Sequence, residues 1–178
     1  MQYFTSISSH LARIRIIIVL MGLLFPSCIF AADIRITSEN PVQPVTYSDK
    51  HGKEQSVDFG KYKLTALHFW ATWCQPCVRE LPAVDAAQQK YEKKNFKVIA
   101  LALDGKNVDN VKKFYSDNNI KSLDIMLYEN MDSFKDMGIK GLPTTIFINN
   151  KGHEIARADG PLDWESAGVK QFIDERLK

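Results

Sequence analysis

The sequence lacks any strong excess of charge. It has 23 Lys and Arg residues against 21 Asp and Glu, a formal net charge of +2 over 178 residues. That balance excludes a dedicated nucleic-acid-binding protein, which carries a large basic excess. Repeats, low-complexity stretches and a series of long apolar segments are missing too, which excludes a collagen-like, a disordered and a polytopic membrane protein. With 45% hydrophobic residues, the chain suits one globular domain or two small ones.

One short apolar run, residues 16–25, lies near the start of the chain. It follows Arg13 and Arg15 and precedes Pro26, and no acidic residue occurs before residue 32. A basic leader followed by a short apolar run is typical of a secretory signal peptide, and the run is too short for a membrane-spanning helix. We expect residues 1–31 to be a signal peptide or an N-terminal anchor. Residues 32–178 would then form a domain in the periplasm or another extracytoplasmic space.

Cysteine is scarce, and its distribution is informative. Cys28 lies in the leader, where lipidation is an alternative to removal, although the preceding residues 25–27 fit a lipidation motif poorly. The exported part then contains only Cys74 and Cys77. An oxidising compartment allows a disulfide to persist, but a pair three residues apart closes too small a loop to stabilise a fold. The pair therefore indicates redox chemistry.

The exported part alternates strand and helix patterns. Residues 64–71 and 96–103 are apolar on both faces, which predicts buried central strands. The remaining pattern predicts a loose, extended lead-in at 38–44, a hairpin of 45–48 with 54–59, a helix through Cys77 and Tyr91, and a helix capped by Asn107. It then predicts a short strand at 124–127, a short helix at 131–137, a hairpin of 145–148 with 154–158, and a last helix capped by Asp163. This order predicts an α/β fold, with helices on both faces of a mixed central sheet and an N-terminal β-hairpin.

The two cysteines lie where the first central strand passes into a helix. Ligand chemistry in such folds belongs at the carboxyl end of a central strand, which is where Trp73 and Cys74 fall. Backbone N–H groups and the helix dipole at a helix N-terminus stabilise a thiolate and lower its pKa. Cys77, one turn further along, is placed to attack a mixed disulfide formed by Cys74. Half of a zinc site is the alternative, but it would need two more ligands, which the sequence does not supply at a suitable spacing.

Residues 73–77, Trp-Cys-Gln-Pro-Cys, resemble the active site of the thioredoxin superfamily. Residues 69–74 and Gly-Leu-Pro-Thr-Thr at 141–145 narrow the resemblance to the exported TlpA/ResA-like thiol:disulfide oxidoreductases. It extends from about residue 45 to the C-terminus. The resemblance implies a thioredoxin fold, Cys74 as the attacking nucleophile, Cys77 as the resolving thiol, and a redox-active disulfide between them.

The resemblance also assigns a substrate-binding loop. Pro143 matches the cis-proline of the superfamily, whose loop pairs with an extended substrate, whereas bond statistics alone favour a trans bond. Leu142 precedes this proline, and Trp73 flanks the first cysteine. Trp73, Leu142 and Pro143 are therefore expected to contact the substrate.

Two titratable residues near the cysteines have two interpretations each. Glu80 matches a glutamate of the subfamily, which predicts proton transfer and tuning of the thiol pKa values; a solvated helix face is the alternative. His68 stands where thioredoxin has an aspartate and TlpA-like proteins often have an asparagine. It is either a proton carrier for Cys77, since imidazole titrates near neutrality, or a satisfied core residue.

The resemblance implies a reductase of protein disulfides with no cofactor and no metal. Its expected partners are disulfide-bonded proteins, including apocytochromes c in cytochrome c biogenesis, and a membrane electron donor of the DsbD/CcdA type. We expect a monomer that binds no nucleic acid. A disulfide-donating oxidant is one alternative, because reduction potential decides direction. A copper-binding protein that uses the dithiol as soft ligands is another, although no Met or His adjoins Cys74.

Overall fold

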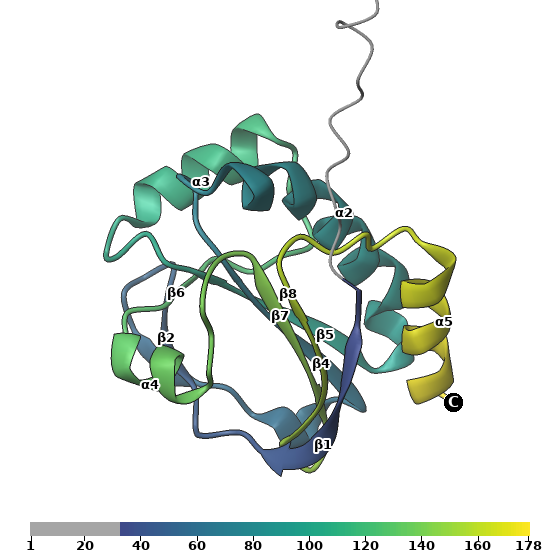
Figure 1. Ribbon diagram of the computed structural model, residues 1–178. Coiled ribbons are helices and arrows are strands. Elements are labelled where there is room, and N and C mark those ends of the chain that lie inside the picture. The colour runs from purple at the N-terminus through teal and green to yellow at the C-terminus, as the bar shows by residue number, and fades with distance from the viewer. Residues whose placement is uncertain (1–32) are drawn as a thin grey trace, which may run out of the picture. The chain divides into compact units, whose positions relative to one another are not determined.

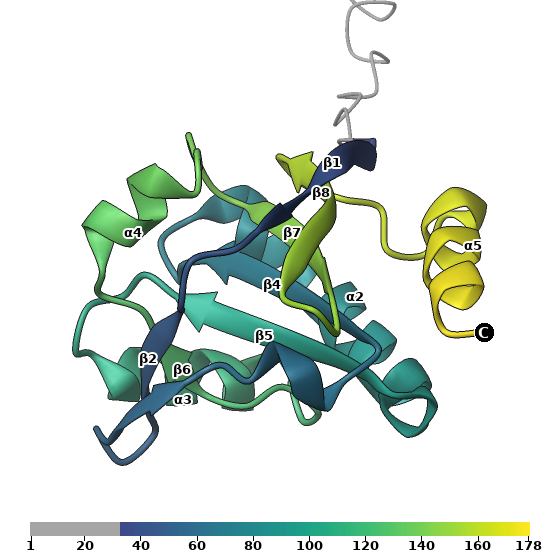
Figure 2. The same ribbon diagram turned by 90° about the horizontal axis from the view of Figure 1, so that it is seen from below.

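The computed structural model describes residues 33–178, which form one compact unit (Figures 1 and 2). The expected signal peptide or anchor at 1–31, with Cys28, lies outside the described residues. Among the residues from 33 onward, no helix is long and apolar enough to cross a membrane.

Eight strands form one mixed sheet in the order β1-β8-β7-β4-β5-β6-β2-β3. Strand β4 pairs in parallel with β5 and antiparallel with β7, and β5 pairs in parallel with β6. The strands are β1 (Arg35–Pro41), β2 (Thr46–Asp49), β3 (Glu54–Ser56), β4 (Leu64–Trp70), β5 (Phe96–Ala102), β6 (Met126–Leu127), β7 (Thr144–Asn149) and β8 (His153–Asp159). The β2–β3 pair is the predicted N-terminal hairpin, and the β7–β8 pair is the second predicted hairpin.

The two central strands are β4 and β5, as the sequence predicts. Every residue of β4 is buried, and six of the seven in β5 are buried. Both strands have neighbours on each side and apolar layers on each face, so their side chains have no solvent-facing side. The carboxyl end of β4 therefore emerges from the middle of the sheet.

Helices cover both faces of the sheet, which confirms the predicted architecture. They are α2 (Gln75–Tyr91), α3 (Val108–Asp117), α4 (Met131–Asp136) and α5 (Ala167–Arg176), with 3-10 turns η1 (Phe59–Lys61) and η2 (Glu92–Lys94). One apolar cluster joins the sheet to α2, α3 and α5, and a second joins the opposite face to α4. Figure 1 shows α2 and α5 together on one side of the strands and α4 on the other.

The loose, extended lead-in expected at 38–44 is wrong for residues 38–41, whereas residues 42–44 are irregular as predicted. Residues 35–41 form strand β1, which pairs antiparallel with β8 and lies at one edge of the sheet. Six of its seven residues are exposed, and the strand has no buried face that would require alternating apolar and polar residues. Because an exposed edge strand is held by backbone pairing to a distant strand, its sequence alone does not predict it.

The expected cap of the last helix is also wrong. Ser166, and not Asp163, is the N-cap of α5, and its hydroxyl accepts a hydrogen bond from the backbone N–H of Val169. Asp163 accepts from the N–H of Glu165 two residues later, in the turn before the helix. Asp and Ser both form such local bonds, so the sequence pattern did not discriminate between them.

Candidate active site

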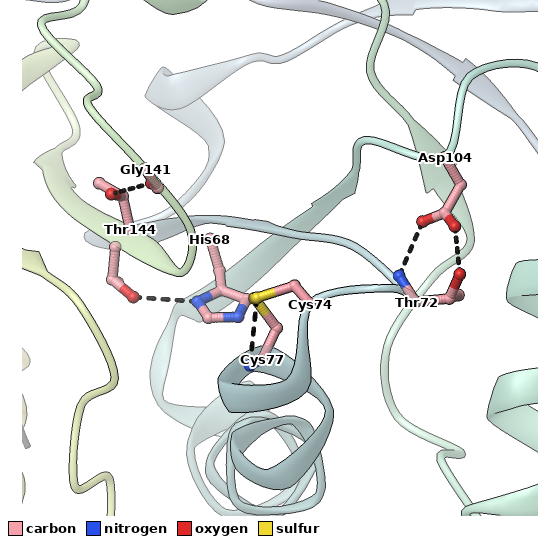
Figure 3. The surroundings of a disulfide bond; sticks show 8 residues. His68, Thr72, Cys74, Cys77, Asp104, Gly141 and Thr144 are labelled. Atoms are coloured by element: carbon pink, nitrogen blue, oxygen red, sulfur yellow. Dashed lines mark hydrogen bonds between the residues drawn. A yellow bond between two sulfur atoms is a disulfide. The ribbon is translucent and has the colours of Figure 1, made fainter. Parts of the chain in front are cut away.

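The two cysteines form a disulfide at the start of α2 (Figure 3). Cys74 is the N-cap residue in an extended conformation, and a proline occupies the first turn of the helix. The backbone N–H of Cys77 donates to the sulfur of Cys74 across 3.4 Å. A thiolate formed at Cys74 on reduction would keep this donor and face the positive end of the helix dipole. Cys74 retains 6% exposure, whereas Cys77 has none.

Asp104 fixes the loop that leads to the disulfide. It follows β5, whose carboxyl end lies beside that of β4. Its carboxylate accepts a hydrogen bond from the backbone N–H of Thr72 across 3.0 Å and a second one from the Thr72 hydroxyl. The next residue, Trp73, is 67% exposed. No sequence pattern points to Asp104, because the contact joins residues 32 positions apart.

The Leu142–Pro143 peptide bond is cis, as the resemblance predicts. Pro143 immediately precedes β7, whose first residue, Thr144, is paired with Phe69 near the end of β4. This register places the proline beside the end of the strand that leads to the cysteine pair. The carbonyl of Pro143 accepts a hydrogen bond from Gly160 across 2.9 Å. Leu142 is partly buried and packs against both apolar clusters.

Glu80 is buried, which excludes the alternative of a solvated helix face. Its exposure is 7%, and it lies one turn after Cys77 on α2. Desolvation raises the pKa of Glu80 from 4.5 to about 7, against the opposing effects of hydrogen bonds from Trp164 and the Leu162 backbone. A carboxyl group with such a pKa exchanges a proton near neutral pH, which suits proton transfer beside a dithiol.

Trp164 is the partner of Glu80, and sequence patterns missed it. Its indole N–H donates to Glu80 Oε1 across 2.7 Å, from the connection between β8 and α5. The tryptophan is 3% exposed, and its ring meets that of His68 edge to face with centroids 6.2 Å apart. The three side chains therefore form one buried group on the α2 face, although they come from three separate segments.

His68 is a neutral core residue. It is fully buried in β4, and desolvation lowers its pKa from 6.5 to about 3. Its Nδ1 lies 3.0 Å from the hydroxyl of Thr145, while its Nε2 has no hydrogen-bond partner within residues 33–178. The expectation that this imidazole titrates near neutrality is wrong, because burial strongly disfavours the charged ring.

The described part of the chain, 33–178, contains no group of three or more His, Cys, Asp or Glu side chains that could hold a metal ion. Cys74 and Cys77 are positioned for reversible exchange between a dithiol and a disulfide. A cysteine pair that begins the helix after a central strand, with a cis-proline beside it, defines the thioredoxin-like thiol:disulfide oxidoreductases. The chain belongs to the Redoxin family, whose model matches residues 37–173.

Individual relatives agree with this assignment. Thiol-disulfide oxidoreductase ResA of Bacillus thuringiensis subsp. konkukian is 30% identical over 145 residues, which cover 82% of this chain and 78% of the relative. Sporulation thiol-disulfide oxidoreductase A of Bacillus subtilis is 28% identical over 166 residues, which cover 90% of this chain and 95% of the relative. A thioredoxin-family thiol:disulfide interchange protein from Chlorobium tepidum has the same fold, with a TM-score of 0.63 and 23% identity. The match covers 80% of this chain and 99% of that structure. The protein is a ResA-like thiol:disulfide oxidoreductase.

Proposed function

We propose that this oxidoreductase reduces disulfide bonds of protein substrates outside the cytoplasm. The observation that carries the proposal is the placement of Cys74 at the N-terminus of α2, with the fully buried Cys77 one turn behind it. The outer sulfur is the one that a bulky substrate can reach, and it is also the one that receives a backbone N–H. This supports Cys74 as the nucleophile and Cys77 as the resolving thiol.

The proposed reaction consists of two exchanges. The Cys74 thiolate attacks one sulfur of the substrate disulfide, which forms a mixed disulfide and releases the other substrate sulfur as a thiolate. The Cys77 thiolate then attacks the Cys74 sulfur, which forms the Cys74–Cys77 disulfide and releases the second substrate thiolate. Two electrons pass to the substrate, and its two thiolates take up protons.

Three residues around the dithiol are proposed to bind the substrate. Trp73 offers a largely exposed indole directly before the nucleophile. Leu142 and Pro143 precede the first residue of β7 and lie beside the end of β4. An extended substrate segment bound along this loop would present its disulfide to Cys74.

We propose that Glu80 serves the proton transfers of Cys77. It lies one turn beyond that cysteine and has a pKa of about 7, so it can accept or release a proton at neutral pH. His68 was expected as a possible carrier. With a pKa near 3, its ring would act only as a transient acceptor, and Glu80 is the better matched group.

The direction of the reaction follows from the compartment. An exported dithiol becomes oxidised and stays so unless a donor reduces it, so the proposal includes a membrane electron donor of the DsbD/CcdA type. Apocytochromes c, which need reduced cysteines for haem attachment, are the proposed substrates. The apolar run at residues 16–25, with its basic leader, supports export by a signal peptide.

Equilibration with glutathione tests the direction. The Cys74/Cys77 couple should have a potential nearer to thioredoxin's, about −270 mV, than to the roughly −120 mV of DsbA. The difference of about 150 mV corresponds to about 7 kcal/mol for two electrons, so the two cases separate clearly. A potential near that of DsbA would favour the disulfide-donating oxidant.

Trapping tests the roles of the two cysteines. Cys77→Ser should accumulate mixed disulfides with a protein substrate, because the resolving step is blocked. The matched variant Cys74→Ser should accumulate few, since Cys77 is inaccessible. Equal trapping by both variants would contradict the assignment.

A further inference from the structure

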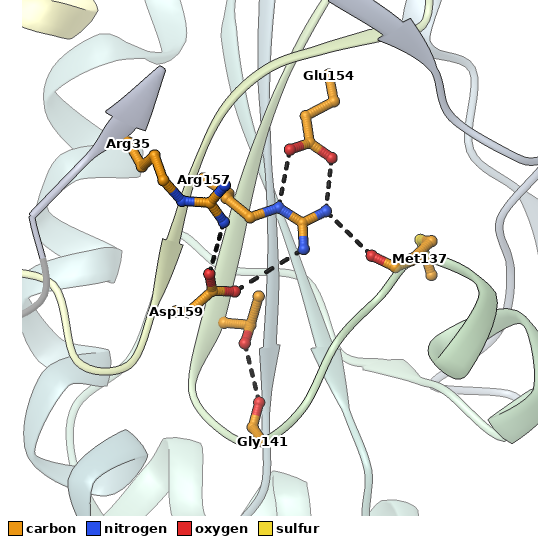
Figure 4. A network of polar contacts seen from close by, with 7 residues as sticks. Arg35, Met137, Gly141, Glu154, Arg157 and Asp159 are labelled. Carbon is orange, nitrogen blue, oxygen red and sulfur yellow. Dashed lines mark hydrogen bonds and ion pairs between the residues drawn. The ribbon is translucent and has the colours of Figure 1, made fainter. Parts of the chain in front are cut away.

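A second polar cluster, with a buried ion pair at its centre, lies on β8 (Figure 4). The guanidinium of Arg157 forms a two-point ion pair with Glu154, with nitrogen–oxygen distances of 2.8 and 2.6 Å. Only 12% of the Arg157 side chain and 11% of the Glu154 side chain are exposed. Asp159 lies 3.8 Å from Arg157 and also pairs with Arg35 of β1 at 2.9 Å. Such a buried ion pair is specific in its geometry.

An irregularity in β8 makes this pair possible. Residues three apart in a regular strand point to opposite faces, so Glu154 and Arg157 should not meet. The register with β7 shifts between Phe147, which pairs with Ala156, and Ile148, which pairs with Glu154. The extra residue in β8 brings the side chain of Glu154 to Arg157. β-Bulges commonly re-aim a side chain in this way.

Arg157 also forms a hydrogen bond outside the sheet, from the same nitrogen that donates to Glu154 Oε2. Its Nη2 donates to the backbone carbonyl of Met137, the C-cap residue of α4, across 3.0 Å. Gly138 follows with a φ of +67°, and from there the chain continues to the cis-proline. Arg157 thus fixes the first residue of the connection that ends at Leu142–Pro143.

The same strand also fixes the other end of that connection. Gly160, directly after β8, donates its N–H to the carbonyl of Pro143 across 2.9 Å. Between the two ends, the Thr144 hydroxyl donates to the carbonyl of Gly141 across 2.9 Å. Residues 138–143 are therefore held at one end by Arg157 of β8 and at the other by Gly160, which follows β8. Figure 4 shows the segment between Met137 and Gly141 passing beside the cluster.

We infer that Arg157 is a positioning residue for substrate binding, because its bond to Met137 sets the place of the Leu142–Pro143 loop. This inference rests on the proposed function, in which that loop binds a protein substrate. Arg157 does not touch the cysteines, so it should affect only substrates large enough to use the loop. Misplacing a binding loop by a fraction of an ångström is sufficient to weaken binding severalfold.

The test uses variants that separate positioning from stability. Arg157→Met combined with Glu154→Met removes both buried charges together, which is often neutral for stability. Arg157→Lys keeps the charge but loses the planar fork, so it cannot bind Glu154 twice and also reach Met137. Arg35→Met is the matched control, because it removes an exposed arginine of the same network.

Four quantities would be measured for each variant: KM and kcat for reduction of insulin, the rate of exchange with glutathione disulfide, and the potential of the cysteine pair. The double variant and Arg157→Lys should raise KM for insulin about fivefold and leave the glutathione rate and the potential unchanged. Arg35→Met should match the original protein in all four.

An unchanged KM in both Arg157 variants would overturn the inference. A parallel loss with insulin and glutathione disulfide, together with a changed potential, would overturn it too, since that pattern indicates a general structural role. Should the double variant fail to fold, Arg157→Lys alone decides. If the original protein exchanges with glutathione but reduces no protein disulfide, the proposed function itself fails, which is a different result.

Discussion

Two buried glutamates on opposite faces of the sheet have almost the same exposure and different partners. Glu80 is 7% exposed and receives a hydrogen bond from the neutral indole of Trp164. Glu154 is 9% exposed and forms a two-point ion pair with Arg157. The neutral cluster comprises His68, Glu80 and Trp164. The ionic cluster comprises Glu154, Arg157 and Asp159.

The comparison shows that the partner, more than the depth of burial, decides what a buried carboxyl group can do. Without a cation beside it, desolvation dominates and raises the pKa of Glu80 to about 7. In the ionic cluster, the hydrogen bonds with Glu154 raise the pKa of Arg157 and hold its guanidinium in one place. The first arrangement suits proton transfer, and the second suits a fixed geometry.

The largest effect is expected from His68→Asn in the neutral cluster. The pKa of His68 is about 3 when folded and near 6.5 when unfolded. Below pH 6.5 His68 binds a proton in the unfolded chain but not in the folded protein. The free energy of unfolding therefore falls as the pH drops toward 3. The loss approaches about 5 kcal/mol at the lower limit. Urea unfolding of the oxidised protein at several pH values should show a smaller acid loss in the variant. An equal loss would mean that His68 is protonated in the folded protein.

Arg157→Ala tests the ionic cluster. It leaves the carboxylate of Glu154 buried without its cation, which should lower the free energy of unfolding by about 3–5 kcal/mol. Arg35→Ala is the control, because that pair is exposed and should change stability by less than about 1 kcal/mol. Urea unfolding at pH 7 measures both. Similar small losses would place Arg157 among ordinary surface residues.

Glu80→Gln should produce a pH effect of opposite sign to that of His68→Asn. Since the pKa of Glu80 is raised to about 7, the folded protein keeps a proton between pH 4.5 and 7 that the unfolded chain releases. The stability this provides is complete below pH 4.5 and is lost as the pH rises through 7, a loss of about 3 kcal/mol. The variant should therefore gain stability relative to the original protein by that amount over this range. The oxidised form is used so that the thiols do not titrate.

The same variant tests the proposed role of Glu80 in proton transfer. In the reduced protein, the pH profile of thiol alkylation should lose the step near pH 7, because a glutamine cannot exchange a proton. An unchanged profile would leave Glu80 as a buried residue without influence on the dithiol.

Trp164→Phe has the smallest expected effect and isolates one hydrogen bond. The indole N–H stabilises the charged form of Glu80, so its loss should raise the pKa of Glu80 further. The step in the alkylation profile should move to higher pH accordingly. In a Glu80→Gln background, Trp164→Phe should leave the pH profile of alkylation unchanged. A shift that persists there would come from packing against His68 instead.

The local sequence pattern was sufficient to predict strand β4 and the start of helix α2, where the cysteines lie. Strand β4 is apolar on both faces because it is central, and Pro76 and the N-terminal position of Cys74 mark the start of α2. The cis bond at Pro143 came from the resemblance, since no rule of composition predicts it. The hairpins β2–β3 and β7–β8 followed from their turn residues and alternation.

The sequence pattern did not predict the burial, pairing or hydrogen bonds of residues that depend on a distant partner. Glu80 lies beside Arg79 in a helix sequence that is compatible with solvent, and Trp164, 84 residues away, accompanies its burial. Strand β1 shows no period of its own and depends on β8. Arg157 reaches Met137 only because a bulge turns Glu154 toward it.

The amino-acid sequence by itself determined the order of the strands and helices from β2 onward and the position of the cysteine pair at a strand–helix junction, because these depend on residues within a few positions of one another. Tertiary structure decided which carboxyl group titrates near neutral pH, which residues hold the cis-proline loop and which strand closes the sheet. Those properties depend on desolvation and on contacts between residues tens of positions apart, which exist only once the chain is packed.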